Sequence, residues 1–310
     1  MNENTKSAFI AIIGRPNVGK SSLLNSILPY KVAAVSDKPQ TTRTRIMGVY
    51  TKNKDQLVFI DTPGFHKPRN LLGDNMIKAV NSGISDVDAA ILVIDAAPKF
   101  KLSNDNLPPA EEELIKTLHS RKIPTILAIN KIDLVKEKED LLPIISTYSS
   151  KYHFKSIVPI SALEKNGIDV ILEEALKFTK NSVHYFSDDS VTDQPEKTLV
   201  CEIIREKTLR LLDKEIPHGI AVELERFFER DNTSGEPIIE VHAVLYCEKD
   251  SHKGIIIGKG GVMLKKIGTA ARYDIEEFFG CKCSLKLWVK VKENWRNNPG
   301  IIHSLGLEVN

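Results

Sequence analysis

A glycine-rich stretch near the start of the chain has the composition of a phosphate-binding loop. Residues 14–22 read GRPNVGKSS, which contains the pattern Gly-x-x-x-x-Gly-Lys-Ser. Glycine allows backbone N–H groups to surround phosphate oxygens where a helix begins. In this pattern Lys20 reaches the β- and γ-phosphates of a nucleoside triphosphate, and the Ser21 hydroxyl binds Mg²⁺. The expected nucleotide contacts in the loop are Gly14, Asn17, Val18, Gly19, Lys20, Ser21 and Ser22.

A second motif indicates which nucleotide base the site binds. Asn130, Lys131 and Asp133 stand in the tetrapeptide NKID, directly after an apolar run. The Asp133 carboxylate accepts hydrogen bonds from the ring N–H and 2-amino group of guanine, and adenine would leave it unsatisfied. Ser161, Ala162 and Leu163 follow a later apolar run, where their backbone N–H groups suit the guanine oxygen. We therefore predict GTP and GDP as ligands and exclude an ATP-dependent kinase or helicase.

Two further segments complete a hydrolytic site. Asp61 and Gly64 stand in the tetrapeptide DTPG, where Asp61 is expected to hold Mg²⁺ through water and the Gly64 amide to meet the γ-phosphate. Thr42 lies in an irregular stretch, where a threonine closes over Mg²⁺ and γ-phosphate and releases them after hydrolysis. Spacing alone leaves Thr41 open as the alternative. The expected catalytic residues are Lys20, Thr42, Asp61 and Gly64, and the expected Mg²⁺ ligands are Ser21, Thr42 and Asp61.

The residue after Gly64 is Phe65, which has no group that orients a water molecule. Enzymes of this type that position water with glutamine carry it at this place, so slow intrinsic turnover is expected. Phe65 then serves as a packing residue. Arg43 and Arg45 have the chemistry of arginine fingers, but exposed switch residues or nucleic-acid contacts are the preferred interpretation.

A second glycine loop lies in the last fifth of the chain. Residues 254–268 read GIIIGKGGVMLKKIG, and after Gly258 and Lys259 comes glycine rather than serine or threonine, so Mg²⁺ has no hydroxyl ligand. A Gly-x-x-Gly loop at a helix N-terminus instead brings bare backbone against nucleic-acid phosphates, the clamp of KH modules. The expected RNA contacts are Ile257, Gly258, Lys259, Gly260, Gly261, Lys265, Lys266 and Arg272.

The charge distribution changes at this loop. Residues 202–250 hold 7 Lys and Arg against 12 Asp and Glu, and residues 253–296 hold 10 against 4. The net charge therefore goes from −5 to +6, although the whole chain carries only +2. A concentrated positive charge around a glycine loop favours a polyanionic ligand. On the run SLKLWVKVK, Trp288 alternates with lysines and either stacks bases or, as preferred here, covers a helix or domain junction.

Two domains are needed to position these motifs. Short apolar runs at 8–13, 56–61, 89–95, 124–130 and 156–161 alternate with amphipathic segments such as 111–120 and 170–180. This alternation predicts a mostly parallel sheet covered by helices on both faces, with ligands at the carboxyl ends of the strands. We predict a first domain over 1–180, a linker over 181–197, and a second domain over 198–310 containing a helix, two strands, helices flanking the glycine loop, and a strand.

Composition excludes several classes of protein. The chain has 310 residues, of which 42% are hydrophobic and 27% charged, and no apolar run approaches the ~20 residues that cross a bilayer. Its first residues lack the pattern of a secretory signal. Four scattered cysteines indicate a reducing compartment, and Cys281 and Cys283 are expected to pack as small apolar residues rather than to bind metal.

The motifs resemble those of the Era family, bacterial ribosome-assembly GTPases among the TrmE-Era-EngA-like GTPases. The matching segments are GRPNVGKSSLLN, QTTRTR, DTPGFHKP, NKID and SAL, followed by EIIREK, ELERF, IGKGG and LWVKVK. The resemblance covers nearly the whole chain. It implies a doubly wound, mostly parallel α/β P-loop GTPase domain followed by an α+β KH domain of type II.

The resemblance also implies partners. It implies that the GTP-bound form engages the 3′ end of 16S rRNA during maturation of the small (30S) ribosomal subunit, and that hydrolysis promotes release. It implies activation by K⁺ through Asn17, for which turn-capping is the structural alternative. A monomer in the cytoplasm, peripherally associated with the inner membrane, is expected.

Two other functions compete with this one. A tRNA-modifying or other ribosome-associated GTPase is disfavoured because no helical catalytic domain or terminal cysteine motif is present. A non-enzymatic RNA-binding scaffold is disfavoured by the intact Lys20, Ser21, Asp61 and Asp133.

Overall fold

The computed structural model describes residues 5–38, 40–65, 68, 70–96, 107–212, 219–231 and 235–308. The chain divides into two compact units. The first contains residues 1–33, 42–67 and 76–193, and the second contains 34–41, 68–75 and 194–310. None of the helices found in the described residues is long and apolar enough to span a bilayer.

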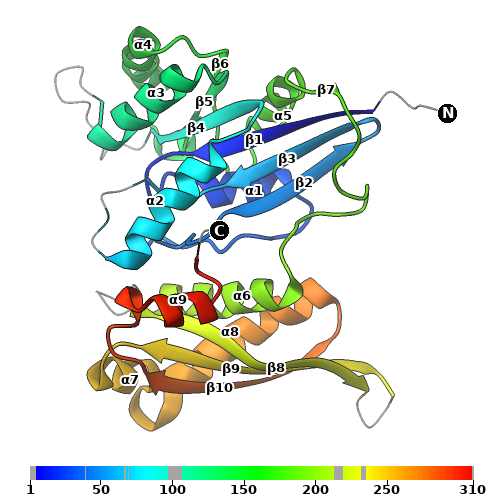
Figure 1. The fold of residues 1–310 in the computed structure, drawn as a ribbon, viewed down its shortest axis with the longest axis vertical. Coiled ribbons are helices and arrows are strands. Elements are labelled where there is room, and N and C mark those ends of the chain that lie inside the picture. Colours follow the sequence, from blue (N-terminus) through cyan, green and yellow to red (C-terminus); the bar gives the residue numbers. More distant parts are fainter. Residues whose placement is uncertain are drawn as a thin grey trace. The chain divides into compact units, whose positions relative to one another are not determined.

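A mixed sheet forms the centre of the first unit (Figure 1). Its strands are ordered β2-β3-β1-β4-β5-β6, with β7 paired to β1. All neighbouring pairs are parallel except β2 with β3 and β7 with β1. The strands are β1 (Lys6–Ile13), β2 (Ile46–Lys52), β3 (Asp55–Asp61), β4 (Ala89–Asp95), β5 (Thr125–Asn130), β6 (Ser156–Pro159) and β7 (Lys180–Asn181).

Helices cover both faces of this sheet, as the alternating pattern predicts. They are α1 (Lys20–Ile27), α2 (Leu71–Gly83), α3 (Pro109–Arg121), α4 (Leu141–Lys151) and α5 (Ile168–Leu176). The helices α2, α3 and α4 pack on one face through Val80, Leu114 and Tyr148, and α1 contacts α5 on the other. Both faces of the inner strands are therefore buried, which explains why β4 and β5 are almost entirely apolar.

The segment expected to be a linker is packed against the first sheet over much of its length. Ser182 N–H donates to Thr5 O over 3.1 Å, and the Gln56 side chain accepts from the N–H groups of Tyr185 and Phe186. Near residue 191 the segment bonds to β2, where Val49 N–H donates to Val191 O over 2.8 Å. Backbone hydrogen bonds, which composition does not reveal, hold this polar segment in place.

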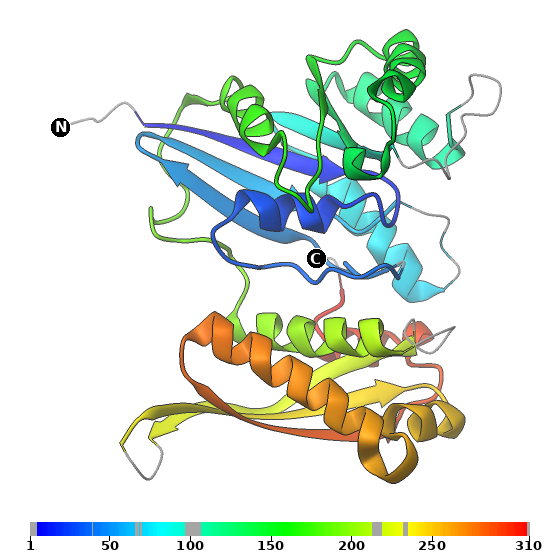
Figure 2. The same ribbon diagram turned by 180° about the vertical axis from the view of Figure 1, so that it is seen from behind.

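The second unit has the element order of a type II KH domain. Its three-stranded sheet is ordered β10-β9-β8, with β9 antiparallel to β8 and parallel to β10. The strands are β8 (Ala221–Asp231), β9 (Pro237–Cys247) and β10 (Lys282–Val291), and the helices are α6 (Glu196–Leu211), α7 (Asp250–Ile257), α8 (Val262–Phe279) and α9 (Pro299–Ser304). Figure 2 shows α6 and α8 lying across one face of this sheet.

The periodicity of α8 explains this packing. Ile267, Ala271 and Ile275 are fully buried and lie on one side of the helix, against the apolar face of the sheet. Lys265, Lys266 and Arg272 are exposed. The helix therefore begins at the glycine loop and presents its basic side chains to solvent.

Candidate nucleotide site and nucleic-acid interface

The predicted nucleotide residues gather at the carboxyl edge of the first sheet. The loop 14–19 joins β1 to α1, Asp61 ends β3, Asn130 ends β5, and Ser161 follows β6. Because these strands are parallel, their ends meet at one edge. Segments separated by more than a hundred residues are thereby assembled into one site.

Backbone shape makes two loop glycines necessary. Gly19 has φ +98°, and a Cβ there would lie 2.1 Å from the Asn130 amide nitrogen. At Gly14, with φ +153°, a Cβ would lie 2.4 Å from Val93 O. Both positions therefore exclude any side chain, because the loop passes directly against two strands.

Lys20 is held inside the loop. Its side chain is buried, and Nζ donates to Gly14 O over 3.2 Å and to Arg15 O over 2.9 Å. Burial lowers the pKa of Lys20 to about 8, an effect that the nearby Asp61 carboxylate partly opposes. An ammonium group held by carbonyl oxygens of the loop is already positioned to donate hydrogen bonds to phosphate oxygens.

Three oxygen-bearing side chains converge beside Lys20. Ser21 Oγ lies 2.6 Å from Asp61 Oδ2 and 2.8 Å from Thr42 Oγ1. Asp61 is fully buried, its Oδ1 has no hydrogen-bond partner within the described residues, and burial raises its pKa to about 6. A buried carboxylate oxygen without a partner, next to two hydroxyls, is a donor set suited to Mg²⁺.

The same geometry bears on the choice between Thr41 and Thr42. The Thr41 hydroxyl donates to Lys38 O over 2.6 Å, within a local turn. The Thr42 hydroxyl instead lies beside Ser21 and 3.5 Å from Asp61 Oδ2. Contact geometry therefore favours Thr42, as the sequence interpretation does.

The base-recognition residues are fastened to the phosphate loop. Asn130 Nδ2 donates to Val18 O over 2.8 Å, and its Oδ1 accepts from Ala162 N–H over 3.0 Å. Lys131 Nζ donates to Asn17 O over 2.7 Å and pairs with Asp95 over 2.6 Å. Asn130 and Lys131 thus hold together the loops that would surround the nucleotide.

Asp133 is oriented by a hydrogen bond. Ser161 Oγ donates to Asp133 Oδ1 over 2.6 Å and accepts from Glu164 N–H over 3.1 Å. The serine therefore fixes the carboxylate that is expected to read guanine. Leu163, two residues after Ser161, is 83% exposed.

Residues around Gly64 are tightly packed. A Cβ on Gly64 would lie 2.6 Å from Pro16 Cα, so the two loops touch at this glycine. Phe65 N–H donates to Gly14 O over 3.1 Å, and the Phe65 side chain packs against the apolar core of the unit. Arg43 differs from the expected exposed residue because its side chain is buried, whereas Arg45 is exposed.

Sequence motifs did not reveal one buried cluster behind the phosphate loop. Arg15 pairs with Glu111 at the start of α3, and the Tyr148 hydroxyl of α4 donates to the same carboxylate. Burial and the Glu111 charge raise the pKa of Tyr148 well above its usual range. These residues are up to 133 positions apart (148 minus 15) and share no motif, so only the fold brings them together.

The second glycine loop, Gly258–Gly261, joins α7 to α8. The apolar run that precedes it forms the end of α7, and Gly258, Gly260 and Gly261 all have positive φ, between +61° and +80°. A Cβ on Gly258 would lie 2.8 Å from Met263 Cβ, whereas Gly260 and Gly261 face open space. Lys259 and Gly260 are exposed at the tip.

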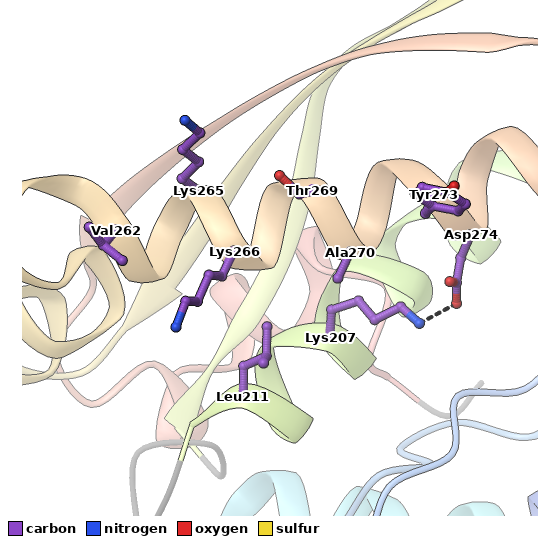
Figure 3. A pocket seen from close by; sticks show the side chains of 9 residues that line it. All are labelled: Lys207, Leu211, Val262, Lys265, Lys266, Thr269, Ala270, Tyr273 and Asp274. Carbon is purple, nitrogen blue, oxygen red and sulfur yellow. Dashed lines mark ion pairs between the residues drawn. The ribbon is translucent and has the colours of Figure 1, made fainter.

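Beyond the loop, α8 borders a groove shared with α6. The groove encloses about 750 Å³ and contains Lys265, Lys266, Leu211 and Tyr273. Figure 3 shows the ion pair between Lys207 of α6 and Asp274 of α8 at one end of this groove. Tyr273 is 71% exposed, an unusual position for a tyrosine on a helix of a folded domain.

Trp288 stands on β10 with its side chain 41% exposed. Its ring meets His242 edge-on at 5.5 Å between centroids. Within the second unit the ring contacts a neighbouring strand, since His242 belongs to β9. Among the cysteines, Cys283 is buried, which raises its pKa to about 12, and the described residues contain no group of three or more His, Cys, Asp or Glu side chains that could hold a metal ion.

Comparisons with known proteins agree with both halves of the chain. A family described as 50S ribosome-binding GTPase matches residues 9–131, and the KH domain family matches residues 215–296. GTPase Era of Clostridioides difficile strain 630 is 48% identical over 301 residues, covering 97% of this chain and 98% of that protein. The chain belongs to the Era family of GTPases.

Another member, GTPase Era of Ruminiclostridium cellulolyticum, is also 48% identical, covering 98% of each chain. Among solved structures, a crystal structure of Era with MgGDPNP and nucleotides 1506–1542 of 16S ribosomal RNA superposes with a TM-score of 0.91 at 34% identity. It covers 98% of this chain and 100% of that one. An Aquifex aeolicus Era variant bound to GDP·AlF₄⁻ gives a TM-score of 0.90 at 34% identity over 98% and 100%. As a member of the Era family, the chain is an enzyme that hydrolyses GTP and carries an RNA-binding KH domain.

Proposed function

We propose that this GTPase binds the 3′ end of 16S rRNA through Gly258–Gly261 and acts in maturation of the small ribosomal subunit. The observation that carries the proposal is the pairing of a GTP loop at Gly14 with a second glycine loop that lacks a Mg²⁺ hydroxyl and begins a basic helix. An Era that is 34% identical was crystallised with nucleotides 1506–1542 of 16S rRNA.

The proposal assigns a role to each residue of the site. Lys20 binds the β- and γ-phosphates, Ser21 and Thr42 bind Mg²⁺ directly, and Asp61 holds it through water. When bound, Mg²⁺ neutralises charge that develops on the phosphates. The remaining contacts come from Gly14, Asn17, Val18, Gly19 and Ser22 to phosphates, and from Asn130, Lys131, Asp133, Ser161, Ala162 and Leu163 to the base.

Binding of GTP is coupled to the KH domain in this proposal. Residues 34–41 belong to the second unit, and the next residue, Thr42, lies beside Ser21 in the first. When Thr42 engages Mg²⁺ and the γ-phosphate, the segment before it is pulled to one position, and hydrolysis releases it. The GTP-bound form therefore holds RNA and the GDP-bound form releases it.

K⁺ supports hydrolysis through Asn17. Asn17 has φ +65°, and its side chain is exposed at the mouth of the phosphate loop. Asn17→Gly keeps this backbone conformation and removes the side-chain oxygen. Stimulation of hydrolysis by K⁺ over Na⁺ should disappear while GTP affinity is retained, and persistent stimulation would remove Asn17 from the cation site.

We further propose a monomer that works in the cytoplasm and associates peripherally with the membrane. The experiment that tests the function as a whole is sedimentation of the protein with purified ribosomal subunits. Binding to the small subunit with GTP, and release with GDP, is expected. Binding to the large subunit instead would contradict the proposal and agree with the description of the first matching family.

A further inference from the structure

A second basic surface lies on the GTPase domain, away from the nucleotide. Its five members line a hollow of about 600 Å³ at the ends of α3 and α4, which lie side by side in Figure 1. They are His119, Lys122, Lys151, His153 and Lys155. We call this set the amino-edge surface, because it borders the first residues of β5 and β6.

The amino-edge surface has one sign of charge. All five side chains are exposed, and none of them makes an ion pair within the described parts of the chain. Glu174 is instead paired with Lys177 over 2.5 Å. Three lysines without counter-charges, beside two histidines, form a positive field that attracts polyanions.

Helix capping accounts for part of this arrangement. Lys151 ends α4 and His119 lies in the last turn of α3, where positive charge favours the helix dipole. His153 and Lys155 lie beyond the end of α4, so capping does not explain them. Together with His119 and Lys151 they form one continuous surface.

The shape of the surface selects the partner. Its larger apolar members are not available to enter a bilayer, because Ile123 is 7% exposed and the Tyr152 hydroxyl is fixed to Ile123 O over 2.7 Å. Surfaces that bind membranes place exposed aromatic or aliphatic groups among the lysines. A hollow walled by lysine and histidine with a fixed aromatic ring instead matches a sugar-phosphate backbone.

We propose that the amino-edge surface is a second RNA contact, which binds phosphates of structured ribosomal RNA while the glycine loop holds the single-stranded 3′ end. The inference rests on the proposed function only in taking ribosomal RNA as the molecule bound. Two contacts on one chain gain from effective concentration, so even a weak second contact strengthens binding to long RNA. The surface lies about 16 Å along β5 from Asn130, calculated from its six residues, so it leaves the nucleotide site untouched.

Lys151→Gln/Lys155→Gln tests the proposal in the full-length, GTP-bound protein. The probes are a long transcript of the 3′ domain of 16S rRNA and a short oligonucleotide of its 3′ end. Affinity for the transcript should fall roughly tenfold, and the slope of log K against log salt should decrease by about 1.4–1.8 for two phosphates. Affinity for the oligonucleotide, GTP hydrolysis and the thermal midpoint should not change.

Matched variants separate charge from position and packing. Lys151→Arg/Lys155→Arg should bind the transcript like the wild type. Lys136→Gln/Lys138→Gln removes two exposed lysines elsewhere on the same domain and should leave the salt slope unchanged. An equal loss in this control, or an unchanged slope in the test variant, overturns the proposal. Loss of binding to phosphatidylserine vesicles with normal RNA binding overturns it in favour of a membrane contact.

The two RNA contacts fail separately. If the wild type does not bind the oligonucleotide while the transcript still depends on Lys151 and Lys155, the amino-edge surface stands and the glycine-loop contact fails. If the oligonucleotide binds and binding of the transcript does not depend on Lys151 and Lys155, the glycine-loop contact stands and the amino-edge surface fails.

Discussion

Asn130→Ala is the substitution whose effect the structure defines most closely. The Asn130 side chain is 2% exposed and makes two hydrogen bonds, to Val18 O and from Ala162 N–H. Alanine removes both hydrogen bonds, so the Val18 carbonyl oxygen and the Ala162 N–H are left buried and unsatisfied. Each unsatisfied group costs about 1–3 kcal/mol, so the total is about 2–6 kcal/mol.

This cost falls on the nucleotide site because the two bonds join the phosphate loop to the loop after β6. At the lower limit of about 2 kcal/mol, GTP affinity decreases about thirtyfold. Titration with a fluorescent GTP analogue measures the affinity, and thermal unfolding without nucleotide measures any loss of stability. Asn166→Ala removes an exposed asparagine of the neighbouring loop and is the matched control. An Asn130→Ala variant that binds within about threefold of the wild type would refute the reasoning.

Three further outcomes are expected. Asp133→Asn should weaken GTP and strengthen xanthosine triphosphate, as competition titrations would show, and unchanged preference would remove Asp133 from base recognition. Because the pKa of Asp61 is raised from 3.8 to about 6, the nucleotide-free protein loses stability as pH rises through 6. Mg²⁺-dependent GTP binding should show the opposite trend, weakening about fivefold between pH 6 and 5, and a flat profile would contradict the Mg²⁺ assignment. Phe65→Gln should lower the thermal midpoint, since Phe65 packs on the core, without accelerating hydrolysis; faster single-turnover hydrolysis would show that glutamine orients water here.

Local motifs predicted the nucleotide residues because each chemical role requires a particular residue type at a particular place. Lys20, Asp61 and Asn130 were predicted from short patterns that follow apolar strands. The pairing of Asn130 with Val18, and of Glu111 with Arg15 and Tyr148, depends on how the strands and helices are ordered in space. No local pattern contains that order.

Two elements of the fold were not predicted from the sequence, for different reasons. The strand Ile46–Lys52 mixes apolar and polar residues because it lies at the sheet edge, and it pairs antiparallel with β3 across a turn in which Asn53 has φ +56°. Residues 181–193 are polar and aperiodic, yet they are fixed by backbone hydrogen bonds and by Gln56. Runs of apolar residues identify the inner strands of a sheet. An edge strand, or a polar segment held by backbone hydrogen bonds, contains too few apolar residues to be recognised in this way.

The structure distinguishes the glycines of the loop Gly258–Gly261 from one another. The sequence treated its glycines as equivalent, but a side chain at Gly258 collides with Met263, so substitution there disturbs the loop even without RNA. Gly260 faces open space at φ +61°, a conformation that Asn and Asp adopt more readily than other side chains. Gly260→Asp and Gly260→Asn therefore differ in charge alone.

That pair provides the most direct test of an RNA-binding GTPase whose second glycine loop holds phosphate. RNA crosslinked to the GTP-bound protein on small ribosomal subunits would be sequenced for the wild type and both variants. We predict that the wild type and Gly260→Asn crosslink to the 3′ end of 16S rRNA, and that Gly260→Asp loses this crosslink while hydrolysing GTP at the normal rate. Equal crosslinking by all three proteins would contradict the account.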